Sequence, residues 1–129
     1  MPQVRINLIK GRSAAEKLAV STVVRRAMAQ SLGVPESGTN HRFVEFAPGD
    51  WILPEGASER FVLIEATLFA GRSSQAKGDF YAAVTAGLEA LGVPGNDVLI
   101  VLIEGPRENW GMRGGQRADQ IDMGYRVGV

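Results

Sequence analysis

The sequence contains no cysteine and only one histidine, and these two shortages exclude several kinds of chemistry. Without cysteine there are neither disulfides nor a thiolate nucleophile, a composition compatible with a reducing cytoplasm, where we place the protein. A single histidine, His41, rules out a multi-histidine metal site, and no group of carboxylates has the spacing of metal ligands. We therefore expect no metal and no other cofactor.

An excess of charge is also missing, because Lys+Arg and Asp+Glu number 14 each and the formal net charge is zero. No basic field indicates nucleic acid as a partner. No apolar run approaches the length of a membrane span, and no signal peptide precedes Pro2, so we expect no membrane partner. The 129 residues, 45% hydrophobic and 22% charged, are typical of one globular domain with a substantial core.

Pro2 is the first residue that suggests chemistry. Methionine before a small residue such as Pro2 is usually removed, and its removal would leave a secondary amine at the start of the chain. The reference α-amino pKa is roughly 7.7–8.0. Burial or nearby cations would lower this pKa further, into the range where a general base is most useful. Pro2 alone is no motif, however, and an ordinary second residue would look the same.

The residues after Pro2 predict that this amine is held in place. Apolar and polar residues alternate from Gln3 to Leu8, which is the period of a half-buried strand. Gly11 then interrupts the strand, and Ser13 can cap a helix. Pro2 lies at the very start of the strand, where its missing N–H is tolerated, and the sheet would hold its nitrogen at a fixed point.

The chain repeats itself, since residues 11–35 resemble residues 71–94. Both segments begin with Gly-Arg-Ser and end with Leu-Gly-Val-Pro, after a shift of 60 positions at the start and 59 at the end. An apolar stripe at the helical period occupies corresponding positions in the two segments. Its members are Val20, Val24, Ala27 and Met28 in the first segment, and Phe80, Val84, Gly87 and Leu88 in the second.

Each half of the chain predicts a strand, a helix and a strand. The expected ranges are 2–9, 13–32 and 42–47 in the first half, and 61–69, 73–91 and 97–104 in the second. Such a crossover joins parallel strands with a right-handed connection. Two units side by side give an α+β fold, with a four-stranded mixed sheet and two helices on one face. We expect one domain over 1–129, with repeats at about 2–47 and 61–104, a linker at 48–60 and a tail at 105–129.

The apolar run from Val98 to Ile103 indicates a strand that is buried on both faces. Two helices cover only one face of a four-stranded sheet, so we expect another copy of the chain to cover the second face in an obligate oligomer. Trp51, in the linker, is either a packing anchor or an interface residue. The tail has few apolar residues and is a candidate to dock on a neighbouring copy.

Together these features resemble the tautomerase superfamily, whose members use an amino-terminal proline. The resemblance is carried by Pro2, the strand VRINLI, Gly-Arg-Ser at 11–13, Trp110-Gly111 and the later pair Gly114-Gly115. Because the strand–helix–strand unit occurs twice, the chain is most similar to the fused branch, with malonate semialdehyde decarboxylase and then the cis-3-chloroacrylic acid dehalogenase group. The resemblance implies a homotrimer, a small carboxylate substrate and no cofactor.

The resemblance also implies roles for particular residues. Pro2 matches the catalytic proline, and Arg72 occupies the place of an arginine that binds the substrate carboxylate. The equivalent of Arg72 in the first repeat is Arg12, which we interpret as a solvated residue at a helix start. Arg42 matches a second substrate-binding arginine, although a surface strand residue would fit as well. Trp110 matches an aromatic wall of the site, with the core or an interface as the alternative.

Some positions depart from the branch. The decarboxylase pattern has an aspartate before the position of Arg42, where this chain has His41, or Asn40 with a shifted gap. His41 could polarise a carbonyl or position water, or be a surface loop residue. An earlier arginine of the decarboxylase pattern is Ala70 here. The water-activating glutamate of the dehalogenases has no clear match among three nearby carboxylates, Glu104, Glu108 and Asp119.

These observations favour a proline-dependent tautomerase acting on a small 2-oxo or enol acid, in which neutral Pro2 removes a proton next to a carbonyl. A second interpretation is a hydratase or decarboxylase of the malonate semialdehyde type, in which cationic Pro2 polarises a carbonyl. A third, of a different class, is a binding protein like macrophage migration inhibitory factor with a vestigial pocket.

Overall fold

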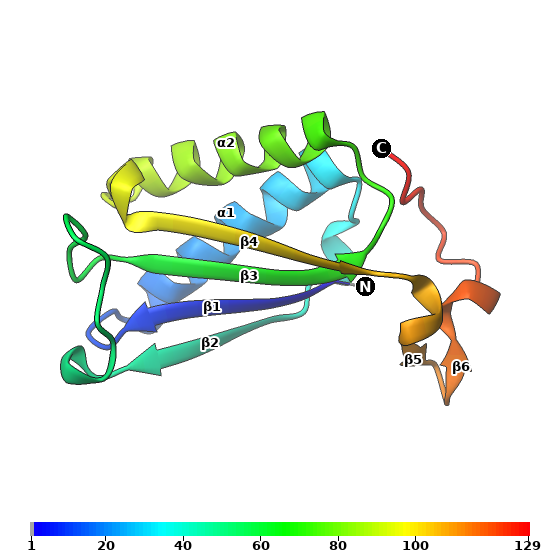
Figure 1. Cartoon of the computed structure of the whole chain (residues 1–129), viewed down its shortest axis with the longest axis horizontal. Coiled ribbons are helices and arrows are strands. Elements are labelled where there is room, and N and C mark those ends of the chain that lie inside the picture. The colour runs from blue at the N-terminus through cyan, green and yellow to red at the C-terminus, as the bar shows by residue number, and fades with distance from the viewer. Residues whose placement is uncertain (1) are drawn as a thin grey trace.

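The computed structural model describes residues 2–129, and its elements follow the two repeats (Figure 1). The first repeat forms β1 (Gln3–Ile9), α1 (Ala14–Leu32) and β2 (His41–Phe46). The second forms β3 (Val62–Phe69), α2 (Ser74–Ala90) and β4 (Val98–Gly105), and a small hairpin of β5 (Gly111–Met112) and β6 (Gln116–Arg117) follows. The predicted α+β fold is confirmed, and each predicted helix or strand end lies within one residue of the observed end.

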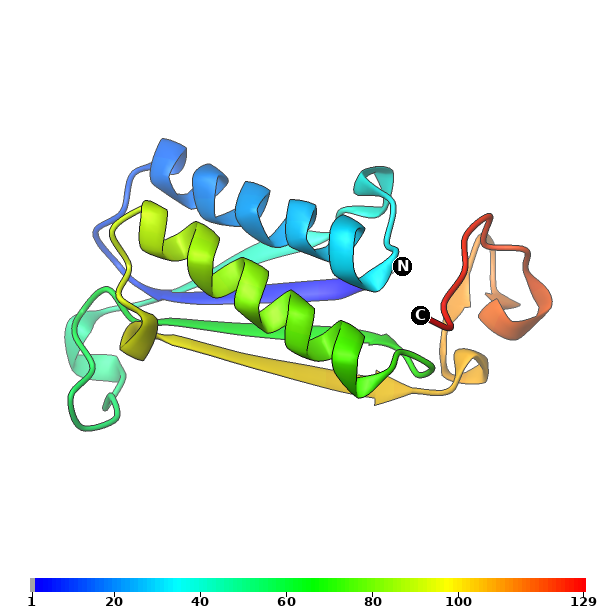
Figure 2. The same cartoon turned by 90° about the horizontal axis from the view of Figure 1, so that it is seen from above.

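The four long strands form one sheet in the order β2–β1–β3–β4. Strands of the same repeat are parallel, whereas β1 and β3 meet antiparallel, with Gln3 beside Thr67 and Leu8 beside Val62. The sheet is therefore mixed, as predicted. This register brings the starts of β1 and β2 and the ends of β3 and β4 to the same end of the molecule, where both chain termini also lie (Figure 2).

Both helices lie side by side on one face of the sheet (Figures 1 and 2). The predicted stripe forms the core there, since its members are almost entirely buried: Val20, Val24, Ala27, Met28, Phe80, Val84 and Leu88. Gly87 serves the contact between the helices, because a Cβ at this position would come within 2.5 Å of the Val23 side chain. Neither described helix is long and apolar enough to cross a bilayer.

The other face of the sheet is bare in the part of the chain that the structure describes. Every second residue of β4 packs towards the helices, while Leu99, Val101 and Ile103 alternate outwards and are 47%, 40% and 47% exposed. The run from 98 to 103 was expected to be buried on both faces, and within one chain only its inner half is covered. The outer half forms an apolar stripe on the bare face.

Equivalent serines begin the two helices. The Ser13 hydroxyl accepts a hydrogen bond from the Glu16 amide at 3.1 Å, and the Ser73 hydroxyl accepts one from the Ala76 amide at the same distance. Ser73 also donates to the backbone carbonyl of Val129 at 2.9 Å, so the second cap holds the end of the chain as well as the helix.

Replacing these serines should separate the two roles. Ser13→Ala and Ser73→Ala should each lower the free energy of unfolding by about 1 kcal/mol, the usual contribution of a side-chain N-cap. Only Ser73→Ala should also increase amide hydrogen exchange in residues 123–129, because it removes the bond to Val129. Urea unfolding and exchange measured on both variants would check this, and equal tail exchange in the two would contradict it.

The linker and the tail both pack on their own chain. Trp51 lies against Phe46 and Phe61, with ring centroids 5.2 Å and 5.5 Å away, so it is a packing anchor. The tail packs within the chain, and its docking on a neighbouring copy stays a prediction. It returns to the end of β3 and forms a second apolar cluster, with Val127 against Phe69. The chain reverses direction after β4, and the returning tail covers the Phe69 ring at the end of β3.

Candidate active site

The predicted site residues gather at the end of the sheet where the termini lie. Pro2 precedes β1 and His41 begins β2, while Arg72 follows β3 and Trp110 follows β4. The pairing of Val4 with His41 and of Gln3 with Thr67 fixes these segments relative to one another. The antiparallel contact of the repeats thus brings the start of one half to the end of the other.

Pro2 is buried at the start of β1. A backbone hydrogen bond from Val4 to the carbonyl of Asn40, at 2.9 Å, holds the segment that follows it. Pro2 borders a cavity of about 10 Å³, whose lining includes Met28 and Val34 from the end of α1 and its following turn. This volume is close to the minimum for one water molecule. The residue therefore occupies a fixed, largely apolar position.

His41 borders the same small cavity as Pro2, and its Nδ1 lies 2.8 Å from the hydroxyl of Ser21 on α1. It is the first residue of β2, so the alternative of a surface loop residue is wrong. Burial, and then the positive charge of Arg25, lower the pKa of the imidazole below its usual 6.5. His41 is therefore a neutral group near neutral pH, with one nitrogen held by Ser21.

Arg42 lies on the bare face of the sheet. It is exposed, and its Nη1 donates to the side-chain Oε1 of Gln3 at 3.3 Å. Because successive strand residues point to opposite faces, Arg42 and His41 are directed to different sides of the sheet. The structure thus brings His41 to the cavity at Pro2 and leaves Arg42 outside it.

Arg72 is buried between the end of β3 and the end of α1, with only 6% of its surface exposed. Its Nε donates to the carbonyl of Leu32 at 3.1 Å, and its Nη1 donates to that of Phe69 at 3.0 Å. Nη2 is shielded from solvent and makes no hydrogen bond that meets the usual geometry among the described residues, although Tyr125 interacts with the guanidinium. Burial lowers the pKa of the guanidinium, and Tyr125 and Glu104 oppose this effect.

A larger cavity of about 400 Å³ lies next to Pro2 along β1 and is bordered by Gln3, Thr67, Glu104, Asn109 and Trp110. The Trp110 ring stacks edge-on against Phe69, with centroids 4.8 Å apart. Trp110 therefore packs on the second apolar cluster and also lines a cavity, and its role as a wall of the active site stays a prediction. The side chain of Glu104 in turn is paired with Lys77 of α2.

Several residues at this end were missed by the sequence analysis. Ser21 is a buried polar residue of α1 and Arg25 is half-buried on the same helix, and only the position of His41 on β2 reveals that both act on it. Tyr125 interacts with the guanidinium of Arg72, more than fifty residues away in the sequence, and no sequence motif predicts this contact. Within residues 2–129, no three His, Cys, Asp or Glu side chains are grouped as metal ligands would be.

The sequence of this chain matches models of a known protein family. A model described as tautomerase enzyme matches residues 38–113, more than half of the chain, and a second model with the same description matches residues 2–60. This chain belongs to the tautomerase family. The two matched segments overlap at residues 38–60 and together span residues 2–113, which include both repeats, in agreement with a fused, two-repeat tautomerase.

Solved structures similar to this tautomerase have the same fold. A malonate semialdehyde decarboxylase is 26% identical, with a TM-score of 0.82 over 88% of this chain and 92% of the other. A fused 4-OT described as a symmetric trimer is 27% identical, with a TM-score of 0.80 over 91% and 96%. A second malonate semialdehyde decarboxylase, inhibited by 3-bromopropiolate, is 27% identical with a TM-score of 0.74 over 88% and 91%.

Proposed function

We propose that this tautomerase catalyses keto–enol proton transfer on a small 2-oxo or enol carboxylic acid, with Pro2 as the general base. The observation that carries the proposal is the position of Pro2, buried at the fixed start of β1 and bordering a cavity with Met28, Val34 and His41. Apolar neighbours and the cation of Arg25 both favour the neutral form of an amine at this point. The amine is available once Met1 has been removed.

In this mechanism the Pro2 nitrogen takes a proton from the carbon next to the substrate carbonyl. The electron pair of the broken C–H bond forms an enolate, and the cationic pyrrolidine then returns the proton to another atom of the conjugated acid. The neutral imidazole of His41, held through Nδ1 by Ser21, could donate a hydrogen bond to the developing oxyanion. Trp110 would form an apolar wall that keeps water from the intermediate.

The substrate carboxylate would bind to Arg72, whose positive charge is fixed at the end of β3. Nη2 of Arg72 is the nitrogen that remains for a carboxylate, because Nε and Nη1 already donate to backbone carbonyls. Those bonds orient the guanidinium before substrate arrives, which lowers the entropic cost of binding. Arg42 lies on the bare face, so in this proposal it would reach the substrate from the outer side of the sheet.

We also propose that the enzyme is a homotrimer. The stripe of Leu99, Val101 and Ile103 leaves the second face of the sheet without an apolar cover in one chain. Exposed apolar patches of this kind mark interaction sites. A similar solved structure, the fused 4-OT, is described as a symmetric trimer. Assembly through the bare face would bury the stripe.

A second candidate is decarboxylation or hydration of a 3-oxo acid, with cationic Pro2 polarising a carbonyl. The likeness to malonate semialdehyde decarboxylase favours it, because that structure is described as a basis for decarboxylase and hydratase activities and includes a proline-to-alanine variant. The protonation state of Pro2 separates the two candidates, since a base must be neutral and an electrostatic catalyst must be charged.

A pH–rate profile tests which state of Pro2 is active. For tautomerisation of phenylenolpyruvate, kcat/KM should rise as pH increases through the pKa of the Pro2 amine and then level off. For loss of carbon dioxide from malonate semialdehyde, kcat/KM should fall over the same range. Turnover of phenylenolpyruvate that fell with increasing pH, or turnover of malonate semialdehyde alone, would contradict the tautomerase proposal.

A further inference from the structure

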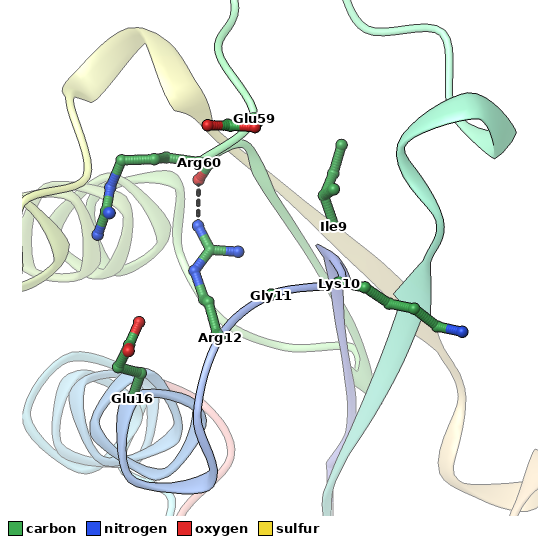
Figure 3. A pocket seen from close by; sticks show the side chains of 7 residues that line it. All are labelled: Ile9, Lys10, Gly11, Arg12, Glu16, Glu59 and Arg60. Atoms are coloured by element: carbon green, nitrogen blue, oxygen red, sulfur yellow. Dashed lines mark hydrogen bonds between the residues drawn. The ribbon is translucent and has the colours of Figure 1, made fainter.

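A cavity of about 210 Å³ lies at the opposite end of the sheet from Pro2, where β1 ends and β3 begins (Figure 3). Its lining includes Arg12, Lys10 and Arg60, together with Glu16 and Glu59. Arg12 points towards the backbone of Arg60, and its Nη2 donates to that carbonyl at 2.6 Å. Lys10 is directed away from Arg12, so it contributes its charge from the rim.

Arg12 has an unused donor at this cavity. Its Nη1 is shielded from solvent and has no hydrogen-bond partner among residues 2–129. Burial lowers the pKa of the guanidinium, and the neighbouring charge of Arg60 lowers it further. A buried donor without an acceptor is unfavourable, and more so when it is charged. An anion that supplied the missing acceptor would remove this cost.

The repeat shows how the hydrogen bonds of Arg12 differ from those of its counterpart. Its counterpart, Arg72, spends Nε on the carbonyl of Leu32 at the end of α1. At the end of α2 the corresponding carbonyl, that of Leu91, accepts a hydrogen bond from Arg60 at 3.3 Å instead. Arg60 therefore bonds the carbonyl at the end of α2, and Arg12 does not make the bond that Arg72 makes at the end of α1.

The surroundings of the two arginines also differ in how far they are covered. Beside Arg72, the tail lies so close that a Cβ on Gly71 would be 3.4 Å from the Val127 side chain. The equivalent glycine beside Arg12 is Gly11, and a Cβ there would meet no atom within 4 Å. The same Gly-Arg-Ser motif is thus closed by the tail in one repeat and open in the other.

We propose that this open cavity is a second, non-catalytic site that binds a small organic monocarboxylate through the Arg12 guanidinium. In the second repeat the residue equivalent to Pro2 is Val62, at the start of β3, and it has no free amine. The site can therefore bind an acid but has no base to act on it. The lining holds three cationic and two acidic side chains, a balance of one positive charge that matches a monoanion. A doubly charged anion would meet repulsion from Glu16 and Glu59.

Binding can be followed by NMR on the full chain labelled with nitrogen-15. Sodium propanoate, compared with sodium chloride at the same ionic strength, should shift the amide signals of residues 10–12 and the Nε signal of Arg12 saturably, with a dissociation constant of millimolar order. Arg12→Gln should weaken this binding at least tenfold, and Arg12→Lys, which keeps the charge without the planar fork, should weaken it less. Arg26→Gln, at an exposed arginine of α1, should leave it unchanged.

Several results would overturn the inference. Shifts that stay linear with concentration, or that persist in Arg12→Gln with a native spectrum, would show that no such site exists. If Arg12→Gln fails to fold, wild-type affinity in a folded Arg12→Lys would be equally decisive. Tighter binding of inorganic phosphate than of propanoate would contradict a monocarboxylate site. Pro2→Ala should keep the shifts, so failure of this inference and failure of the proposed catalysis are distinguishable.

Discussion

Pro2→Ala is expected to lower kcat/KM for enol-acid tautomerisation by about 10²–10⁴-fold, the usual contribution of a positioned general base. Alanine leaves a primary amine at the start of the chain, but without the pyrrolidine ring that packs in the cavity lined by Met28 and Val34. The nitrogen would rotate away from the position that proton transfer requires. Steady-state kinetics on phenylenolpyruvate would measure the loss, after intact-mass spectrometry has shown that Met1 is absent.

The matched control is Pro94→Ala, which replaces a proline that follows α2 at the opposite end of the molecule. This variant should retain wild-type kcat/KM, so that a loss confined to Pro2→Ala reports on the amine rather than on proline content. Wild-type turnover by Pro2→Ala would contradict the proposed mechanism, as would full activity in protein that retains Met1. Ligand binding that survives with no turnover in the wild type would instead favour the vestigial binding protein.

Val101→Glu is expected to prevent assembly of the chain. Val101 is the middle residue of the exposed stripe on β4, and burying a carboxylate there without a partner would cost several kcal/mol per subunit. The chain itself should stay folded, because this side chain already faces outwards. Sedimentation velocity should therefore show a mass of 13.8 kDa for the variant, against about three times that value for the wild type.

Leu18→Glu provides the comparison for this assembly test. Leu18 is 65% exposed on the outer side of α1, and the same change of charge and size there should leave the oligomer intact. A trimer that persisted in Val101→Glu would mean that the bare face is not the interface. Dissociation of both variants would mean that added charge, rather than its location, drives the effect.

Most of the fold could be predicted because two independent signals agree in each half of the chain. The Gly-Arg-Ser and Leu-Gly-Val-Pro segments fix where each helix begins and ends, and the apolar stripe fixes which side of it is buried. The tail gave no such agreement. Its packing depends on Val127 meeting Phe69, which are far apart in sequence, and a single apolar residue has no period to reveal its partner.

The residues of the candidate site could be named from the sequence, whereas their contacts could not. Arg12 and Arg72 stand in identical Gly-Arg-Ser motifs, which reveal no difference in their surroundings, and only the family resemblance led us to interpret Arg12 as solvated and Arg72 as substrate-binding. What distinguishes them is the donor to the helix-end carbonyl, because Arg60 bonds that of Leu91 whereas Arg72 itself bonds that of Leu32. His41 was similarly ambiguous, because its contact with Ser21 depends on how β2 is placed against α1.

If the Pro2 amine acts as proposed, the positions of the two termini determine where an affinity tag for purification can be attached. A tag before Pro2 would block its amine, and a tag after Val129 would extend from the residue whose carbonyl is held by Ser73 at the same end of the sheet. The linker lies at the other end, and its exposed turn at Glu55 and Gly56 is the better place for an affinity sequence. An internal tag there would leave the Pro2 amine free and the hydrogen bond between Ser73 and Val129 intact.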